Sequence, residues 1–412
     1  MKICHTSDWH LGHLLCGQRR YEAFAAFLDW LVETLEREQV ELLLIAGDLF
    51  DTATPSNRAQ ELYYHFLSRV ALTGCRHVVV IGGNHDSPAF LDAPKALLAA
   101  LNVHVVGAVG DSLEEEVLLL STPEGRPELL VCAVPYLRDR DIRLSEAAES
   151  PEDKDRKLIQ GVRDHYAAVL EIARRRREAL GVELPLVVMG HLFATGGRVH
   201  DGDGMRDLYV GSLAQISVGI FPDEVDYLAL GHLHLAQQVG GLETRRYSGS
   251  PLPLGFGEAG REKSLCLVTF QGRVPSVRLH PVPVFQALER IRGDRTRILE
   301  RLKALTSTRS RVWVEVIHEG GEPLGDLRER LTEAVAASGV MILRVKDQRS
   351  AGPLPEESPD ERVEELEPEA VFERCLLLRG VPEPLCRELR QAHGEVLAAL
   401  RQEDPHGEEG EG

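Results

Sequence analysis

The sequence predicts an α/β fold, in which strands and helices alternate from residue 1 to about residue 282. Three observations support this class. Short apolar runs of the kind that form buried strands recur along the segment, and longer stretches between them carry the 3.6-residue apolar period of helices. Five of the apolar runs also stop at a polar side chain that could bind a metal ion. This alternation is typical of a layered domain in which helices pack on sheets.

These patterns place the elements in order along the chain. Strands are expected at 2–7, 42–47, 77–82, 103–106, 129–134, 186–191 and 227–231, and three more at 245–248, 265–270 and 274–280 are expected to complete a second sheet. Helices are expected at 19–38, 55–72, 88–101 and 150–180. Thr54 and Pro55 have the residue types of an N-cap and a first helical residue. The four arginines at 174–177 are interpreted as a solvated helix face rather than as a DNA contact.

The chain divides into five expected units. They are an α/β domain at 1–282, a small α+β domain at 283–350, an acidic linker at 351–368, a pair of short helices at 369–403 and a disordered tail at 404–412. Two prolines at 281 and 283 mark the first boundary, and the linker is rich in Pro and Glu. In the small domain, two helical stretches accompany strands at 312–316 and 340–345. The helix pair is too small to bury its own apolar face, so we expect it to pack on a partner.

Composition excludes some classes of protein. The formal charge of −18 is concentrated after residue 350, where 17 Asp and Glu stand against six Lys and Arg. Residues 1–350 therefore carry a net charge of only −7. This acidity argues against a protein that coats DNA, but not against an enzyme that cuts it. No apolar run approaches the roughly 20 residues of a membrane helix, so no membrane partner is expected. Seven cysteines without a C-x-x-C pair favour a cytoplasmic location.

The polar residues at the strand ends predict a metal centre. The candidate ligands are Asp8, His10, Asp48, Asn84, His191, His232 and His234. Strand-end loops at one edge of a sheet are where α/β folds bind ligands. A mixture of oxygen and nitrogen donors suits Mn, Fe or Zn better than Ca. Two such cations repel each other and need a shared anionic ligand, for which Asp48 is the candidate. The two cations would generate hydroxide from water and stabilise an in-line phosphoryl displacement.

Two neighbouring residues are expected to act in catalysis. His85 follows Asn84 directly and could face the substrate as a general acid, with Asp86 accepting its other ring hydrogen and orienting it. His5 and His13 are expected to be structural. Asp51 could either contact the metal ligands from outside or cap the turn that follows it, and the sequence leaves both open.

The motifs resemble those of the calcineurin-like metallophosphoesterases. They are Asp-x-His at 8–10, Gly-Asp-Leu-Phe-Asp at 47–51, Gly-Asn-His-Asp at 83–86, Gly-His at 190–191 and Gly-His-Leu-His at 231–234. The longer runs His-Thr-Ser-Asp-Trp-His-Leu-Gly at 5–12 and Ala-Gly-Asp-Leu-Phe-Asp-Thr at 46–52 narrow the resemblance to the Mre/SbcD nucleases.

This resemblance implies a four-layer β-sandwich flanked by helices, and a ligand set. One ion would be bound by Asp8, His10, Asp48 and His234, and the other by Asp48, Asn84, His191 and His232, with His85 catalytic. Manganese is the preferred ion, with Mg²⁺, Fe²⁺ or Zn²⁺ as alternatives. The small domain would correspond to the DNA-capping domain. The helix pair would dock on an SbcC-type, SMC-like ATPase, within a heterotetramer that contains a homodimer of this chain.

The sequence thus predicts a Mn-dependent DNA nuclease that acts as exonuclease and endonuclease on double-stranded ends and hairpins, in DNA repair, recombination and replication-fork processing. One alternative is a phosphodiesterase of the same scaffold that acts on small phosphoesters or cyclic nucleotides. Another is a scaffold without catalytic activity.

Overall fold

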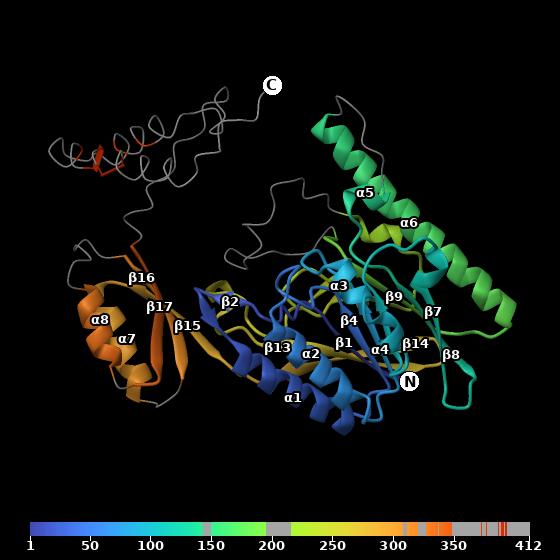
Figure 1. Ribbon diagram of the computed structural model, residues 1–412, viewed down its shortest axis with the longest axis horizontal. Helices are drawn as coiled ribbons and strands as arrows, with labels where there is room; N and C mark the ends of the chain where they lie inside the picture. Colours follow the sequence, from blue (N-terminus) through green and yellow to red (C-terminus); the bar gives the residue numbers. More distant parts are fainter. Residues whose placement is uncertain are drawn as a thin grey trace.

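The computed structural model describes residues 1–142, 150–194, 216–307, 311–319, 327–336 and 338–347, with seven single residues near the C-terminus: Phe372, Leu376, Cys386, Leu389, Arg390, Ala392 and His393. The chain forms a large domain, from β1 to β14, and a small domain, from β15 to β17 (Figure 1). The α/β class predicted from the sequence is confirmed.

Two six-stranded sheets form the centre of the large domain. The first has the order β14 (Val274–Val282), β13 (Lys263–Gln271), β1 (Lys2–Thr6), β4 (Leu42–Ala46), β5 (His77–Ile81) and β6 (Val103–Val106). The second has the order β11 (Gln237–Val239), β12 (Leu242–Tyr247), β10 (Tyr227–Gly231), β9 (Leu186–His191), β8 (Pro127–Ala133) and β7 (Val117–Ser121). The four strands β1, β4, β5 and β6 are parallel, and so are β8, β9, β10 and β12.

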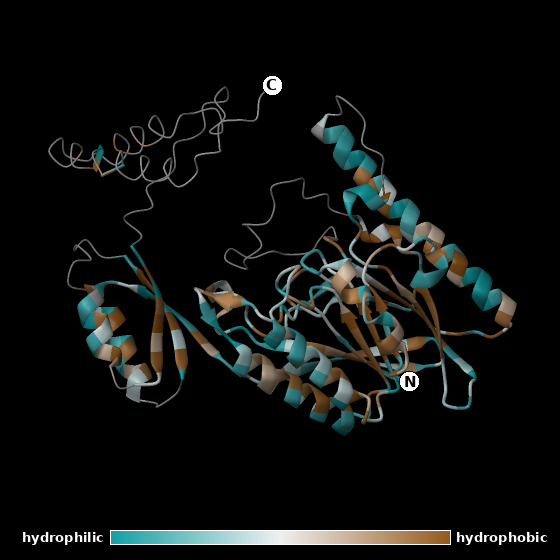
Figure 2. Cartoon of the chain, viewed as in Figure 1, coloured by the Kyte–Doolittle hydropathy of each residue, from teal (hydrophilic) through white to brown (hydrophobic). Residues whose placement is uncertain are grey.

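Helices cover the outer face of each sheet, which gives four layers. The helices α1 (Tyr21–Arg37) and α2 (Asn57–Val70) bury Phe27 and Phe66 against the first sheet. The long helix α6 (Pro151–Leu180) buries Tyr166 and Val169 against the second. A third apolar cluster, which includes Leu44 and Val187, lies between the two sheets. Because both faces of central strands such as β4 and β9 are buried, these strands are almost wholly apolar, as Figure 2 shows by their brown colour.

Short elements complete the large domain. They are the hairpin β2 (Leu14–Leu15) and β3 (Gln18–Arg19), the helices α3 (Pro88–Asp92), α4 (Lys95–Ala99) and α5 (Asp139–Ile142), and the 3₁₀ helices η1 (Leu113–Glu116), η3 (Val218–Ile220) and η4 (Phe256–Glu258). The helix predicted at 88–101 is therefore two helices. Pro94 lies between them, and its ring prevents a continuous helix.

The N-cap prediction for α2 was wrong by two residues. Ser56 is the cap, because its Oγ accepts a hydrogen bond from the backbone N–H of Ala59 at 3.2 Å. The interpretation of the arginines at 174–177 as a solvated face holds only in part. Arg174 and Arg177 contact Glu224, and the Arg177 side chain is only 13% exposed. Arg176 contacts Glu114 in η1.

The prediction that strands 245–248, 265–270 and 274–280 complete one second sheet was wrong for two of them. Only β12 joins the second sheet. The strand β13 pairs antiparallel with β1, and β14 pairs with β13, so both extend the first sheet. The local pattern does not reveal which sheet a strand joins, because apolar strands of either sheet look alike in sequence.

The small domain is a β-α-β-α-β unit with a parallel sheet. Its elements are β15 (Ala287–Gly293), α7 (Arg295–Ser307), β16 (Val312–His318), α8 (Leu327–Val335) and β17 (Val340–Asp347). The strand β15 was not predicted from the sequence. The predicted linker and tail lie outside the described residues, as do residues 195–215 and most of residues 369–403.

Among the described residues, an apolar cluster joins the two domains. Leu15 of β2, Phe256 of η4 and Leu288 of β15 are buried together, with Trp313 and Leu343 of the small domain packed against them. In the part of the chain that the structure describes, no helix combines the length and the apolar character needed to cross a bilayer.

Candidate metal centre

The carboxyl ends of strands from both sheets meet at one edge of the large domain. Two backbone hydrogen bonds join the loop after β1 to the loop after β4. The N–H of Asp8 donates to the backbone oxygen of Gly47, and the N–H of His10 donates to that of Asp48, both at 3.0 Å. Across the sheets, the N–H of His232 donates to Oδ1 of Asp8 at 2.9 Å. Segments more than 200 residues apart in sequence thus form one site.

Four of the seven predicted ligands have left-handed backbone conformations. Their φ angles are +53° for Asp8, +47° for His10, +51° for Asp48 and +102° for His232. Non-glycine residues rarely adopt this region, and it costs about 1–3 kcal/mol each. The sharp turns it produces direct consecutive side chains toward the same centre. Cys16, Gln39 and Asn102 also have positive φ, but four of the seven such non-glycine residues that the structure describes are predicted ligands. Strain that gathers at one site in this way is typical of functional residues.

Glycines next to the ligands permit the close approach of the loops. A Cβ atom on Gly231 would lie 1.8 Å from the backbone oxygen of Ala46, and one on Gly83 would lie 2.2 Å from the backbone nitrogen of Asp48. Both obstacles are backbone atoms, which cannot rotate away. The Gly-His and Gly-Asn pairs of the motifs therefore have a steric reason.

Asp48 lies at the middle of the centre and is almost fully buried. Its Oδ2 is 3.3 Å from Nε2 of His191 and 3.5 Å from Nε2 of His10. Its Oδ1 accepts the backbone N–H of His85 at 2.9 Å. Two imidazoles from different segments thus approach the same carboxylate oxygen, and a ligand shared by two cations needs such an arrangement.

The other ligands form groups on the two sides of Asp48. Ligand atoms of Asp8, His10 and His234 lie within 4.8 Å of one another. On the other side, Oδ1 of Asn84 lies 3.0 Å from Nε2 of His191 and 3.0 Å from Nδ1 of His232. The structure therefore brings all seven predicted ligands together. Both ring nitrogens of His10 are buried without a well-aligned hydrogen bond, so this donor set fits divalent cations.

Residues behind the ligands fix the imidazole rings. Nδ1 of His191 donates to the backbone oxygen of Ala46 at 2.9 Å. Nδ1 of His10 lies 3.3 Å from the Asp51 carboxylate, which is also 2.9 Å from Nδ1 of His13. Such partners set the tautomer of a metal-binding histidine and increase its basicity. Of the two roles left open for Asp51, the structure favours contact with the ligands.

His5 and His13 have structural contacts, as expected. Nε2 of His13 lies 2.9 Å from the backbone oxygen of Leu254. His5 lies between the two sheets, with Nδ1 at 2.9 Å from the Tyr227 hydroxyl and Nε2 at 3.2 Å from the backbone oxygen of Leu230.

The ionisation of the centre follows from its burial and its charges. Burial alone would raise the pKa of the Asp48 carboxyl, but His191 and His10 hold that pKa well below its usual range. For His191, burial is opposed by the Asp48 carboxylate, which raises the pKa to about 9. Burial and the charge of His191 lower the pKa of His232. A proton on Nε2 of His191 and a cation would compete for the same position, so cation binding should release protons.

The expected contact between Asp86 and the ring of His85 is wrong. The buried carboxylate of Asp86 accepts three backbone N–H groups, from Gly83 at 2.9 Å, Phe50 at 2.9 Å and Leu49 at 3.1 Å. It thereby joins the loop after β5 to the loop after β4. Nδ1 of His85 instead lies 2.8 Å from the backbone oxygen of Asp51. The sequence spacing could not distinguish the two acceptors.

Sequence reasoning also missed contacts from segments without a metal-binding motif. Ser7 Oγ donates to the Asp8 carboxylate and lies 2.8 Å from Ser248 Oγ. Glu258 of η4 lies beside His234. Ser7 lies inside the motif at 5–12, but Ser and Glu are common in loops. Ser248 and Glu258 lie in segments without a metal-ligand motif, so the sequence carries no signal for these contacts.

The fold and the centre define a metal-dependent phosphoesterase. The family model described as calcineurin-like phosphoesterase matches residues 1–236. The model described as type 5 capsule protein repressor C-terminal domain, SbcD_C, matches residues 284–379.

Three relatives are named as the SbcD subunit of the nuclease SbcCD. The protein of Escherichia coli strain K12 is 36% identical over 406 residues, which cover 97% of this chain and 98% of the relative. That of Rhodobacter capsulatus is 31% identical over 388 residues, or 90% and 93% of the two chains. That of Bacillus subtilis is 34% identical over 270 residues, or 65% and 66%. The chain belongs to the SbcD family of nucleases, within the calcineurin-like phosphoesterases.

Proposed function

We propose that the chain is the nuclease subunit of an SbcCD-type complex and hydrolyses phosphodiester bonds of DNA with two Mn²⁺ ions. Asp8, His10, Asp48 and His234 would bind one ion, and Asp48, Asn84, His191 and His232 the other. The observation that carries the proposal is the convergence of these seven side chains around the buried carboxylate of Asp48. Mg²⁺, Fe²⁺ and Zn²⁺ remain alternatives to Mn²⁺ for such mixed ligands.

When bound, two cations would supply an activated water and stabilise the charge that develops on the phosphate. The role proposed for the chain itself centres on His85. Because Nδ1 of His85 faces a backbone oxygen, which only accepts, it must carry a hydrogen. Nε2 is then the ring position at which a proton can be given or taken. We assign it to protonation of the departing sugar oxygen.

Asp86 has a positioning role in this proposal. Its three backbone hydrogen bonds hold the segment that carries Asn84 and His85 against the loop of Asp48. It would act on catalysis through these residues, without contacting the substrate.

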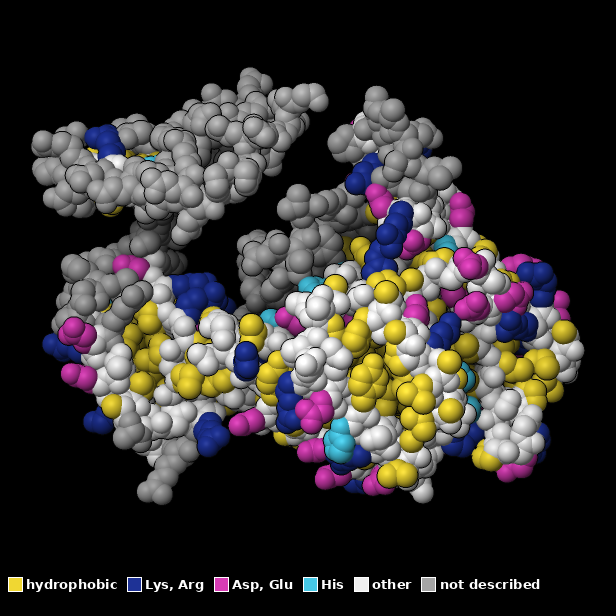
Figure 3. Space-filling view, viewed as in Figure 1, with side chains coloured by type: hydrophobic (Ala, Val, Ile, Leu, Met, Phe, Trp, Pro, Cys, Tyr) yellow, Lys and Arg dark blue, Asp and Glu magenta, His cyan; other side chains and the backbone are white. Residues whose placement is uncertain are grey.

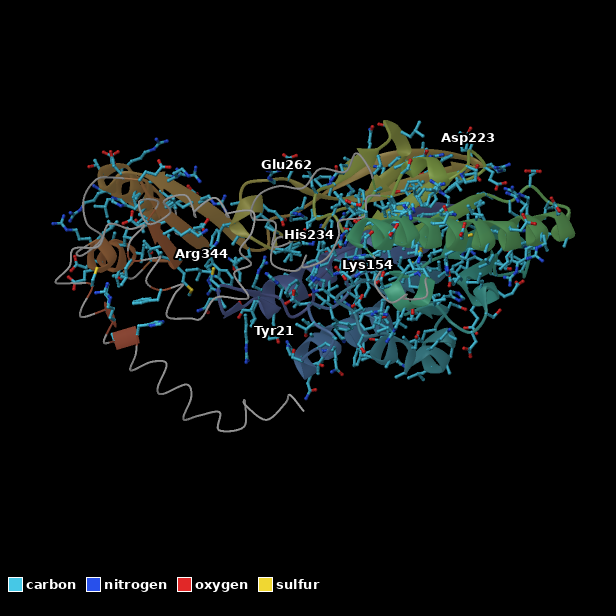
Figure 4. The ribbon with its side chains drawn as sticks, turned by 90° about the horizontal axis from the view of Figure 1, so that it is seen from above. Tyr21, Lys154, Asp223, His234, Glu262 and Arg344 are labelled. Atoms are coloured by element: carbon cyan, nitrogen blue, oxygen red, sulfur yellow. The ribbon has the colours of Figure 1, made fainter. Side chains whose placement is uncertain are left out.

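Basic side chains on the small domain support DNA as the substrate. Arg290 and Arg344 each bond to the buried carboxylate of Glu315, at 2.6 and 2.7 Å, and Nζ of Lys346 lies 3.5 Å from it. Three cations around one anion leave a net positive charge, and the three side chains are 30–49% exposed. In Figure 3, Lys and Arg side chains gather on the small domain beside the large one, and Figure 4 places Arg344 on the side of His234. We propose that Arg290, Arg344 and Lys346 contact DNA phosphates.

The partner would be an SbcC-type, SMC-like ATPase that binds the helix pair at 369–403, in a heterotetramer with two copies of this chain. Most of that segment lies outside the described residues. Among those described, the ring of Phe372 stacks on that of His393 with centroids 4.0 Å apart, and Leu376 and Cys386 are buried. These contacts support a paired arrangement of two helices. The thiols of Cys4, Cys16, Cys75, Cys132 and Cys266 form no disulfide, in keeping with a cytoplasmic location.

Two substitutions test the centre. Asp48→Ala should abolish binding of both Mn²⁺ ions, since it removes the ligand that they share. His85→Ala should slow DNA cleavage by about 10²–10⁴-fold and leave the Mn²⁺ content at two ions. Retention of both ions in Asp48→Ala would contradict the bridging role. Loss of ions in His85→Ala would contradict the role as proton donor.

A second comparison distinguishes DNA from a small phosphoester as the substrate. The variant Arg344→Ala with Lys346→Ala should weaken DNA cleavage and reduce its salt dependence, because two phosphate contacts are lost. Its activity on a chromogenic phosphodiester should equal that of the wild type. Equal activity on DNA as well would favour the small-phosphoester alternative.

A further inference from the structure

The 3₁₀ helix η4 contacts the metal centre with one side chain and the small domain with another. Oε1 of Glu258, its last residue, lies 3.7 Å from Nδ1 of His234. Phe256, its first residue, is buried against Leu288 of the small domain. Two residues span only about 4 Å along a 3₁₀ helix. Displacement of Phe256 should therefore displace Glu258.

Glu258 is a buried carboxylate with only one of its two oxygens hydrogen-bonded. Oε2 bonds to Nζ of Lys263, which also lies 2.8 Å from Oγ of Ser250 and 3.0 Å from the backbone oxygen of His234. Lys263 thereby ties Glu258 to the loop of His234. Oε1 has no hydrogen-bond partner among the described residues, and a buried oxygen of this kind is uncommon without a function.

A partner for His234 would complete a pattern already present in the centre. Nδ1 of His191 faces the Ala46 carbonyl oxygen, and Nδ1 of His10 faces the Asp51 carboxylate. Metal-binding histidines almost always have such a partner, which orients the ring and increases its basicity. At 3.7 Å the contact between Glu258 and His234 is longer than a hydrogen bond, so a small shift of either side chain decides whether the bond forms.

We propose that Glu258 positions the ring of His234 for cation binding, and that Phe256 makes this contact depend on where the small domain lies. The inference rests on the proposed function, because it takes His234 as a metal ligand. A shift of the small domain would move Leu288, then Phe256, and so the carboxylate beside the ligand. Position of the small domain and cation affinity would thus be coupled.

Titration of the full chain with Mn²⁺, followed by calorimetry and by electron paramagnetic resonance, tests the positioning role. Glu258→Gln should weaken one of the two sites by about 10–100-fold and leave the other unchanged. Glu262→Gln, an exposed neighbour labelled in Figure 4, removes the same charge and should change neither site. A folded Glu258→Gln variant with two wild-type sites would overturn the assignment.

A second variant tests the proposal in case Glu258→Gln does not fold. Glu258→Gln leaves Lys263 buried without its counter-charge, which is strongly destabilising. The double variant Glu258→Leu with Lys263→Met removes both charges together and should fold. It should show the same weakened site, and two wild-type sites in it would refute the proposal.

A substitution in the small domain tests the coupling between that domain and cation binding. Leu288→Ala, on β15, should weaken the same site by about three- to tenfold and alter its resonance signal. Leu302→Ala, in the separate core of the small domain, is the matched control and should leave both sites unchanged. Wild-type binding in Leu288→Ala would refute the coupling. If the wild-type chain binds two ions yet cleaves no DNA, the proposed function fails, while the titrations still decide the role of Glu258.

Discussion

Acidification from pH 7.5 to pH 5 should destabilise the large domain through one buried imidazole, that of His5. This ring is fully buried on β1 between the two sheets. Burial, the largest influence, lowers its pKa from 6.5 to about 3. The hydrogen bond to the backbone oxygen of Leu230 raises the pKa, and the charge of Arg246 lowers it. The folded protein therefore keeps His5 neutral at a pH where the unfolded chain protonates it.

The sign and size of the effect follow from this difference. Since the folded pKa is the lower one, the contribution of His5 to stability is complete above pH 6.5 and is lost as the pH falls toward 3. Between these values each pH unit is worth about 1.4 kcal/mol. The loss should reach about 0.8 kcal/mol at pH 6 and about 2 kcal/mol at pH 5.

The assay is urea unfolding of wild type and His5→Gln, followed by tryptophan fluorescence, to which the fully buried Trp9 contributes. Ionisable groups other than His5 contribute equally to both proteins, so subtraction of the two unfolding free energies removes their contribution. Gln can make both hydrogen bonds but does not titrate. The free energy of unfolding of wild type relative to His5→Gln should fall by about 2 kcal/mol from pH 7.5 to pH 5. A difference that stays constant over this range, or that rises, would refute the reasoning.

Three further predictions concern the loops, the cap and the ions. Gly231→Ala should destabilise the protein by about 3 kcal/mol or prevent folding, because the added Cβ would overlap a backbone oxygen. Gly74→Ala is the control, since nothing lies within 4 Å of the added Cβ. It should change stability by less than about 1 kcal/mol in the same denaturation assay. Ser56→Ala should lower the free energy of unfolding by about 1 kcal/mol through loss of the N-cap, and Thr54→Ala should lower it less. A larger loss in Thr54→Ala would show that Thr54 is the cap, as the sequence predicted. Free Mn²⁺ at a hundred times its dissociation constant should raise the free energy of unfolding by about 2.7 kcal/mol per site, measured with and without chelator, and Asp48→Ala should abolish the gain.

Much of the metal centre could be predicted because its chemistry is local in sequence. Each ligand follows an apolar run directly, and the carboxyl ends of parallel strands meet at one sheet edge. That geometry alone indicates that Asp8 and Asp48 lie close together. The helix break at Pro94 also had a local signal, which the periodicity concealed.

The errors concern contacts between distant segments. Whether β13 pairs with β1 or joins the second sheet depends on packing across both sheets, and an apolar strand fits either place. The acceptor for the ring of His85 depended on how the loop after β4 turns, so Asp51 took the place expected for Asp86.

The sequence by itself determined the α/β class, the strands that lead to the metal ligands and the identity of the side chains that end them, because strand periodicity and residue chemistry are local properties. The tertiary structure alone decided which strands pair, which oxygen faces each imidazole, and that Glu258 lies between the small domain and His234. These last facts depend on packing between segments far apart in the chain, which no local pattern encodes.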